Sequence, residues 1–271
     1  YGMVSAQTGY LTELMGAAVF STPKPVQMIG DFIKWFAQGD FVVLDFFAGS
    51  GTTGEAIYRA ATDNDSENPR FILVQLPEVL DSNVAEQRVA AEYCASLGKP
   101  HNIAELTKER LRRAGKKIRE ENPLFAGDLG FRVFKLDSTN IREWDPNHGN
   151  LAETLEASVE HLKKTRTEQD ILFELLLKLG LDLCVPIETK KIGNHEVRSI
   201  GAGTLLVCLS AAIPAKDVET LALGLVAWHK ALKPAGETTV VFRDSAFADD
   251  VAKTNLAAIL AQHGLETVRS L

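Results

Sequence analysis

The feature that most constrains this chain is the junction between an apolar run and a glycine-rich loop near residue 45. Phe41–Phe46 is rich in β-branched and aromatic residues, and this composition predicts a fully buried strand. The run contains one acid, Asp45. Gly49–Gly54 follows, with three glycines, and then the apolar spacing of Thr53–Ala61 predicts a helix capped by Thr52 or Thr53. Phe71–Leu76 predicts a second buried strand. A β-loop-α-β unit of this kind nearly always builds a parallel sheet.

The rest of the chain alternates predicted helices and strands. The opening sixteen residues show no strand or strong helix pattern. Further helices are predicted through Val26–Phe36, Val84–Ser96, Ile103–Glu121, Val218–Leu232 and Asp249–His263, with two more that end at Gly180. Further strands are predicted at Phe131–Leu136, in a hairpin around Gly201–Gly203, at Thr238–Phe242 and at Glu266–Ser270. Pro, Gly and Asn cluster in Asp145–Asn150, which predicts a domain boundary there and a small mixed α/β domain over residues 151–271.

Composition and charge limit the function classes. The 271 residues are 45% hydrophobic and 24% charged, which fits a globular chain of one or two domains. A net charge of -7 is atypical of a general polyanion binder. No stretch reads as a membrane span or signal peptide, so a cytoplasmic location without membrane contact is the default expectation. Cys94, Cys184 and Cys208 are scattered and are interpreted as buried thiols, and the histidines show no metal-ligand spacing.

The chemistry of the glycine loop depends on the residue before it. Gly49–Gly54 satisfies G-x-G-x-x-G, so a nicotinamide or flavin dinucleotide is the first possibility, although this match alone is weak. Asp45, however, places a carboxylate at the end of the first strand, where a cationic group would suit it. S-adenosylmethionine offers an α-ammonium group together with a carboxylate that backbone N–H groups at a helix start can hold. The remaining alternative is a tight turn that binds nothing.

Several motifs in order along the chain resemble one protein family. LDFFAGSGTTG (Leu44–Gly54) resembles the cofactor-binding motif of amino-group DNA methyltransferases, and STPKPVQMI (Ser21–Ile29) resembles the motif that precedes it in one class of them. Five later stretches are similar to modification subunits of type III restriction-modification systems, which methylate adenine at its exocyclic amino group. They are residues 71–78, 103–118, 130–144, 179–188 and 240–255. The resemblance implies part of a Rossmann-like S-adenosylmethionine-dependent methyltransferase sheet in residues 1–150, followed by a smaller mixed α/β C-terminal domain.

The resemblance assigns roles to individual residues. The expected cofactor loop consists of Asp45, Phe46, Ala48, Gly49, Gly51 and Thr52, with Asp45 facing the ammonium group. Ser21, Thr22 and Lys24 match the motif that helps to hold the methionine part. The family pattern has an acid for the ribose hydroxyls at the end of the second strand, but this chain has Gln75 there, with Glu78 as the substitute.

The family's catalytic tetrapeptide, Asp or Asn followed by Pro-Pro and an aromatic residue, does not occur in this sequence. In this class of methyltransferases the tetrapeptide and the target-recognition region precede the Ser21 motif. The resemblance therefore implies the C-terminal part of a modification subunit, with no catalytic residue and no metal in this chain. It also implies double-stranded DNA, a homodimer and a helicase-nuclease restriction subunit as partners.

Alternative interpretations remain open for the whole chain and for two of its segments. The chain could instead be a methyltransferase of RNA or small molecules, or a non-catalytic cofactor-binding or assembly module. The basic run Lys108–Arg119 is interpreted as a solvated helix face or, alternatively, as a DNA phosphate contact. Phe46 is expected to contact the ligand and Phe47 to fill the core, while Arg243–Asp250 is expected to form a loop that caps the next helix.

Overall fold

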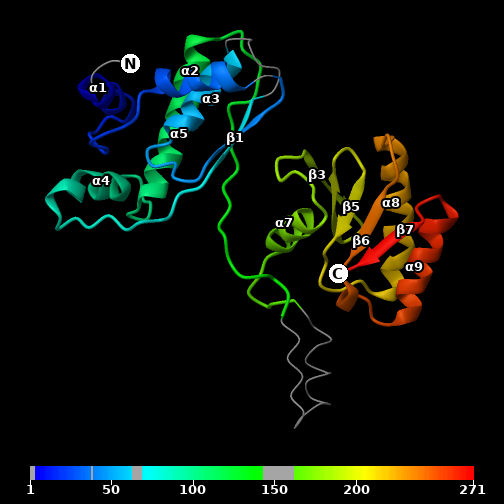
Figure 1. The fold of residues 1–271 in the computed structure, drawn as a ribbon. Coiled ribbons are helices and arrows are strands. Elements are labelled where there is room, and N and C mark those ends of the chain that lie inside the picture. Colours follow the sequence, from blue (N-terminus) through cyan, green and yellow to red (C-terminus); the bar gives the residue numbers. More distant parts are fainter. Residues whose placement is uncertain (1–3, 38, 63–68, 143–161) are drawn as a thin grey trace. The chain divides into compact units, whose positions relative to one another are not determined.

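The protein consists of two compact units, Tyr1–Arg132 and Val133–Leu271, each with its own core (Figure 1). The computed structural model describes residues 4–37, 39–62, 69–142 and 162–271. Both units combine helices with a sheet, which confirms the mixed α/β class. The boundary predicted at Asp145–Asn150 lies outside the described residues.

The N-terminal unit contains the predicted β-loop-α-β arrangement. Its elements are α1 (Val4–Met15), α2 (Val26–Phe36), β1 (Val42–Asp45), α3 (Thr52–Thr62), β2 (Arg70–Leu73), α4 (Ala85–Ser96) and α5 (Ile103–Glu121). β1 and β2 pair in parallel, with Leu44 opposite Ile72, and α3 connects them. The opening segment is helical despite its weak pattern, because α1 buries Leu11 and Met15 against α4 and α5.

The two strands are covered on one face only. Val43 and Phe71 pack with the buried residues of α2 and α3, and Leu73 packs with α5. Leu44 and Ile72 point to the other face and are 58% and 55% exposed. The prediction of fully buried strands is therefore wrong for this face, because within the described residues no element covers it.

The third predicted strand of this region, Phe131–Leu136, is not a strand. Its alternating apolar side chains suggest a half-buried sheet position, but the segment pairs with no neighbouring strand in the described part of the chain. Phe131 packs in the core beside α5, whereas Leu136 is fully exposed. The segment crosses the division between the two units at Arg132 and Val133.

The C-terminal unit is a five-stranded sheet with helices on both faces (Figure 1). Its elements are α7 (Glu168–Lys178), β3 (Ile187–Ile192), β4 (His195–Ile200), β5 (Leu205–Cys208), α8 (Val218–Leu232), β6 (Thr239–Phe242), α9 (Asp250–Gln262) and β7 (Thr267–Ser270), with short 3-10 turns at Ala215–Asp217 and Asp244–Ala246. The strand order is β3-β4-β5-β6-β7, antiparallel up to β5 and parallel from β5 onward. One core lies under α8 and α9 and the other under α7.

Most predicted elements of this unit are confirmed. The helix at Val218–Leu232, the strands near Thr238 and Glu266 and the hairpin around Gly201–Gly203 are all present. Asp249 accepts a hydrogen bond from the backbone N–H of Ala252 at 2.7 Å, so the segment before α9 caps that helix as expected. The β3–β4 hairpin is an additional feature, and the first of the two helices expected before Gly180 lies outside the described residues.

Three further expectations concern cysteines, metals and membranes. Cys94 and Cys208 are buried as expected, but Cys184 is exposed, so its prediction as a buried thiol is wrong. Across the described ranges, no group of three or more His, Cys, Asp or Glu residues could hold a metal ion. Among the described helices, none has the length and apolar content needed to cross a bilayer.

Candidate functional site

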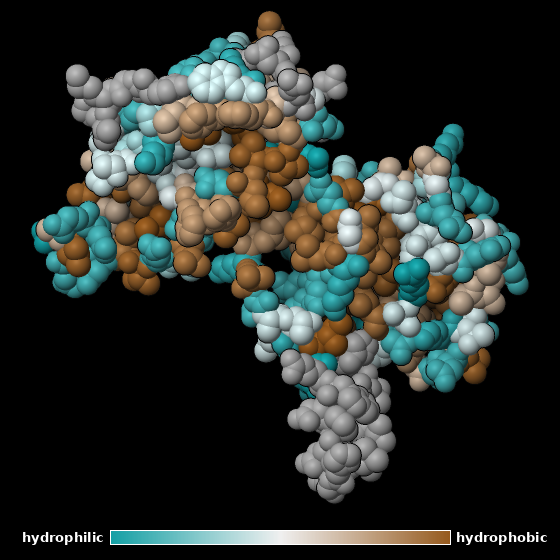
Figure 2. All heavy atoms as spheres, viewed as in Figure 1, coloured by the Kyte–Doolittle hydropathy of each residue, from teal (hydrophilic) through white to brown (hydrophobic). Residues whose placement is uncertain are grey.

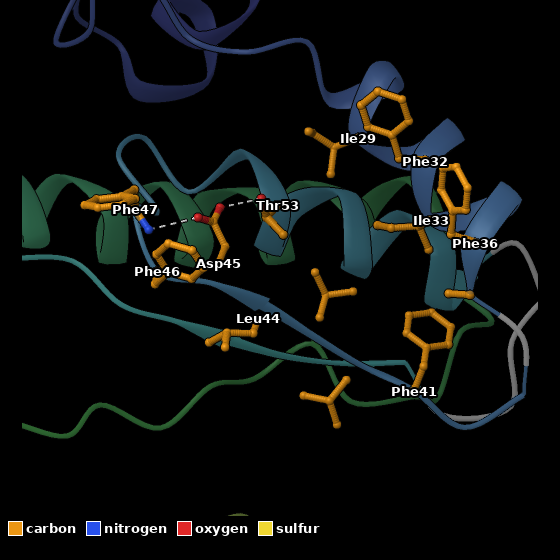
Figure 3. Close-up of a pocket in the computed structure, with 13 residues that line it drawn as sticks. Ile29, Phe32, Ile33, Phe36, Phe41, Leu44, Asp45, Phe46, Phe47 and Thr53 are labelled. Atoms are coloured by element: carbon orange, nitrogen blue, oxygen red, sulfur yellow. Dashed lines mark hydrogen bonds between the residues drawn. The ribbon is translucent and has the colours of Figure 1, made fainter.

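Asp45 lies at the carboxyl end of β1, and its side chain faces the glycine loop and the start of α3 (Figure 3). One carboxylate oxygen accepts a hydrogen bond from the backbone N–H of Phe47 at 3.1 Å, and the other accepts one from the Thr53 hydroxyl at 2.6 Å. A carboxylate can accept about four hydrogen bonds. Asp45 therefore has acceptor capacity left for a cationic group beside the loop.

The three loop glycines meet two different physical requirements. Gly49 and Gly51 have φ values of 50° and 79°, in the left-handed region that L side chains rarely adopt. Gly54 has no such constraint, but a Cβ there would lie 2.6 Å from a methyl carbon of Leu111. The first two glycines shape the turn, whereas the third allows α3 to approach α5.

The loop is held on two sides by residues that are distant in sequence. The backbone N–H of Gly49 donates to the side-chain oxygen of Gln75 at 2.7 Å. The carbonyl of Gly49 accepts a hydrogen bond from the Thr107 hydroxyl at 2.5 Å. Gln75, expected at the ribose, is thus brought to the loop itself, and Thr107 is a contact that the sequence pattern did not reveal.

A buried ion pair lies directly behind the loop. Arg110 of α5 is 1% exposed and donates to the Glu55 carboxylate at 2.9 Å, while Glu55 of α3 is fully buried. The same guanidinium donates to the carbonyl and hydroxyl of Ser50, at 3.1 and 2.7 Å, and to the Thr52 hydroxyl at 2.9 Å. The second oxygen of Glu55 accepts a hydrogen bond from the Tyr10 hydroxyl at 2.5 Å.

This ion pair changes the interpretation of the basic run Lys108–Arg119. The run was interpreted as a solvated helix face, but Arg110 departs from this interpretation because its side chain is buried. Other members of the run pair on the helix itself: Lys108 with Glu105, and both Arg112 and Arg113 with Glu109. Glu55, directly before the buried Ala56 and Ile57 on the helix after the loop, was the sequence signal for a buried basic partner.

The remaining predicted site residues differ in how far they are buried. Ala48 is buried, and its N–H donates to the carbonyl of Val74 at 3.1 Å. Ser21, Thr22 and Lys24 are exposed, and the Lys24 carbonyl is 3.4 Å from the Thr52 hydroxyl that donates to it. Glu78 is exposed on the chain after β2. The structure thus places the segment before α2 next to the loop through Lys24.

An apolar groove of about 630 Å³ runs between α2 and β1 and has Asp45 at one end (Figure 3). Among the described residues that line it, Asp45 alone is charged. Phe46 and Phe47 form the rim beside it, with ring centroids 5.2 Å apart. Phe47 is 80% exposed, so its expected place in the core is wrong, because the loop carries it out of the sheet.

Comparisons with known proteins agree with the motifs. Residues 5–63 match the DNA methylase family. The chain is 38% identical over 126 residues to the type III restriction-modification enzyme StyLTI Mod subunit of Salmonella typhimurium, covering 46% of this chain and 18% of that protein. It is 34% identical over 178 residues to the EcoP15I Mod subunit of Escherichia coli, covering 65% of this chain and 24% of that protein.

A shorter match extends this similarity beyond the type III enzymes. The type II methyltransferase M.KpnI of Klebsiella pneumoniae is 47% identical over 49 residues, which is 18% of this chain and 12% of that protein. The chain spans only 18–24% of the length of the type III relatives it matches. Together, the identities to the Mod subunits confirm the resemblance to type III modification subunits.

Proposed function

We propose that this chain, whose residues 5–63 match the DNA methylase family, binds S-adenosylmethionine for a type III modification subunit that methylates adenine in DNA. The observation that carries the proposal is the Asp45 carboxylate at the end of a parallel strand, directed at a glycine loop and a helix start. The parallel pair β1–β2 would then be part of a Rossmann-like methyltransferase sheet.

The residues present fit the amino-acid end of this cofactor. Asp45 would face the α-ammonium group, and the N–H groups in the first turn of α3, which have no partners within a helix, would hold the carboxylate. Gly49 and Gly51 allow the backbone to turn there without a side chain between loop and ligand. When bound, S-adenosylmethionine supplies an electrophilic methyl group. Ser21, Thr22 and Lys24 would border the methionine part.

The nucleoside end would lie beyond the end of β2. Phe46 is 62% exposed and free to pack against the adenine ring, with Ala48 and Thr52 completing the loop. Glu78 is the better candidate for the ribose hydroxyls, because the Gln75 side-chain oxygen already accepts from Gly49. Gln75 would then support the loop instead of contacting the sugar.

The wider function is proposed from the relatives. Double-stranded DNA, a second copy of the modification subunit and a restriction subunit would be the partners, and the protein would act in the cytoplasm. The sequence contains no Asp-Pro-Pro or Asn-Pro-Pro followed by an aromatic residue. We therefore expect the chain to bind the methyl donor but not to transfer the methyl group to DNA alone.

Titration calorimetry with S-adenosylmethionine and its demethylated product tests the binding. We expect both compounds to bind. We expect Asp45→Asn to lower the affinity for S-adenosylmethionine by about tenfold or more, since the charged partner of the ammonium group is lost. Asp40→Asn, at an exposed acid just before β1, is the matched control and should change little. Binding of NADH without binding of either methyl-donor compound would overturn the proposal.

A second candidate is a non-catalytic cofactor-binding or assembly module. The observation in its favour is the uncovered apolar face of β1 and β2, which suits contact with further polypeptide. Mixing the chain with a modification-subunit segment that carries the tetrapeptide separates the two candidates. Transfer of a labelled methyl group to duplex DNA supports the enzyme. If the chain binds the added segment and S-adenosylmethionine but no methyl group is transferred, the module is supported.

A further inference from the structure

We infer that Arg110 is a positioning residue. By holding the glycine loop from the α5 side, it sets the affinity for the carboxylate end of S-adenosylmethionine. The inference rests on the proposed function, but it concerns a residue of α5 that the loop motif does not include. Arg110 follows Ser50 by 60 positions and Thr52 by 58, and it reaches both through one nitrogen of its guanidinium.

The geometry of the guanidinium explains why arginine suits this position. Its Nε and one terminal nitrogen donate to the same oxygen of Glu55, at 3.1 and 2.9 Å. Its other terminal nitrogen, which carries two hydrogens, lies within hydrogen-bond distance of three oxygens of the loop, on Ser50 and Thr52. A planar fork with five N–H groups can serve both sides at once, whereas a lysine ammonium has three donors at a single point.

The burial of this pair makes it a rigid support. A buried charge without a partner is costly, so Arg110 and Glu55 hold each other in one arrangement. Glu55 is anchored further by Tyr10 and by Arg59, whose terminal nitrogen lies 3.2 Å from the carboxylate. The support therefore extends from α5 through α3 to α1.

The contacts act on the part of the loop that precedes the helix start. Arg110 fixes the Ser50 carbonyl and Thr107 fixes the Gly49 carbonyl, so two successive peptide groups are held from the α5 side. The orientation of these peptide planes decides where the following N–H groups point. Loosening them should weaken the grip on a carboxylate more than the grip on the rest of the ligand.

The experiment compares S-adenosylmethionine with its decarboxylated analogue, which lacks only that carboxylate. We expect the wild-type chain to prefer the carboxylated compound by about tenfold or more. In Arg110→Lys we expect this preference to fall to within about threefold, while the affinity for the decarboxylated analogue changes by less than about twofold. Thr107→Val, which removes the hydroxyl without changing the volume much, should lower the preference in the same direction.

The controls separate this inference from the proposed function and from misfolding. Arg112→Lys lies on the same helix with a half-exposed side chain, and it should leave both affinities unchanged. A wild-type chain that binds neither compound contradicts the proposed function. If the wild type prefers the carboxylated compound but Arg110→Lys and Thr107→Val keep that preference, or lose affinity for both compounds equally, Arg110 does not act through the loop.

Discussion

Individual polar side chains fix segments of the C-terminal unit that have no regular structure. His195, buried at the start of β4, lies 3.1 Å from the Ser210 hydroxyl and 3.3 Å from the Asp217 carboxylate, so it joins the segment after β5 to the start of α8. Glu174 of α7 accepts a hydrogen bond from the N–H of Asn140 at 2.6 Å. A buried polar group that loses its partner costs about 1–3 kcal/mol, so each contact selects one conformation.

Glu174 should make the stability of the unit depend on pH. Burial opposes its ionisation, but hydrogen bonds from Thr139, Lys178 and Asn140 lower its pKa to about 2. Because this pKa lies below the ordinary value, the stabilisation is complete at neutral pH and is lost as the pH falls from about 4.5 toward 2. We expect Glu174→Gln to reduce the free energy of unfolding by about 1–2 kcal/mol at pH 7 and by about half as much at pH 3, since solvent screens the ion pair with Lys178.

Urea unfolding at the two pH values measures this difference. Glu237→Gln, at an exposed position of the same unit, is the control and should stay within about 0.5 kcal/mol of the wild type. A Glu174→Gln effect of equal size at pH 3 and pH 7 would show that the carboxylate is not stabilised as an ion.

At the scale of elements, helices were predicted from local signals and one hairpin was not. The bounds of α5 and α8 agree with the sequence because their apolar periodicity and end signals are local. The β3–β4 hairpin escaped prediction because most side chains of β3, as in IETKKI, are exposed and show no apolar alternation. The turn at Gly193, with a φ of 56°, was the available signal.

The close contact of α3 with α5 gives a prediction at this scale. Gly54→Ala would place a Cβ 2.6 Å from a methyl carbon of Leu111 and 3.1 Å from one of Leu73, so these side chains or the helix α3 must shift. We expect a loss of about 1–3 kcal/mol in the free energy of unfolding. Gly30→Ala in α2 is the matched control, since no atom lies within 4 Å of its added Cβ, and it should stabilise by about 0.5–1 kcal/mol. Thermal unfolding measures both, and equal effects would contradict the packing explanation.

At the scale of the whole molecule, the candidate site is assembled from segments far apart in the chain. The positions of Asp45 and the glycine loop followed from the sequence, because strand, loop and helix are consecutive there. The contacts from Thr107 and Arg110 did not, since they join residues 58 to 60 positions apart and leave no local periodicity. Phe47 was wrongly assigned to the core because its residue type alone does not show that the loop carries it out of the sheet.

The uncovered face of β1 and β2 should contribute to the surface behaviour of the chain (Figure 2). Leu44 and Ile72 lie side by side on it, and exposed patches of this kind bind apolar dyes and promote association. We expect the double variant Leu44→Thr, Ile72→Thr to bind less anilinonaphthalene sulfonate and to stay soluble at higher concentration. Threonine keeps the β-branched shape that strands favour, so the unfolding temperature should change little.

A matched comparison uses Val43→Thr, on the covered face of the same strand. This substitution should lower the unfolding temperature without reducing dye fluorescence in the native state. Unchanged dye fluorescence in the Leu44→Thr, Ile72→Thr variant would show that the dye does not bind at this face.

The distribution of the three thiols has a practical result for such studies. Because Cys94 and Cys208 lie inside their units and Cys184 is at the surface, a maleimide fluorophore should react at one position of the unaltered chain under native conditions. The labelled protein would tumble more slowly on joining a larger assembly. Fluorescence anisotropy could then detect a binding partner without any engineered cysteine.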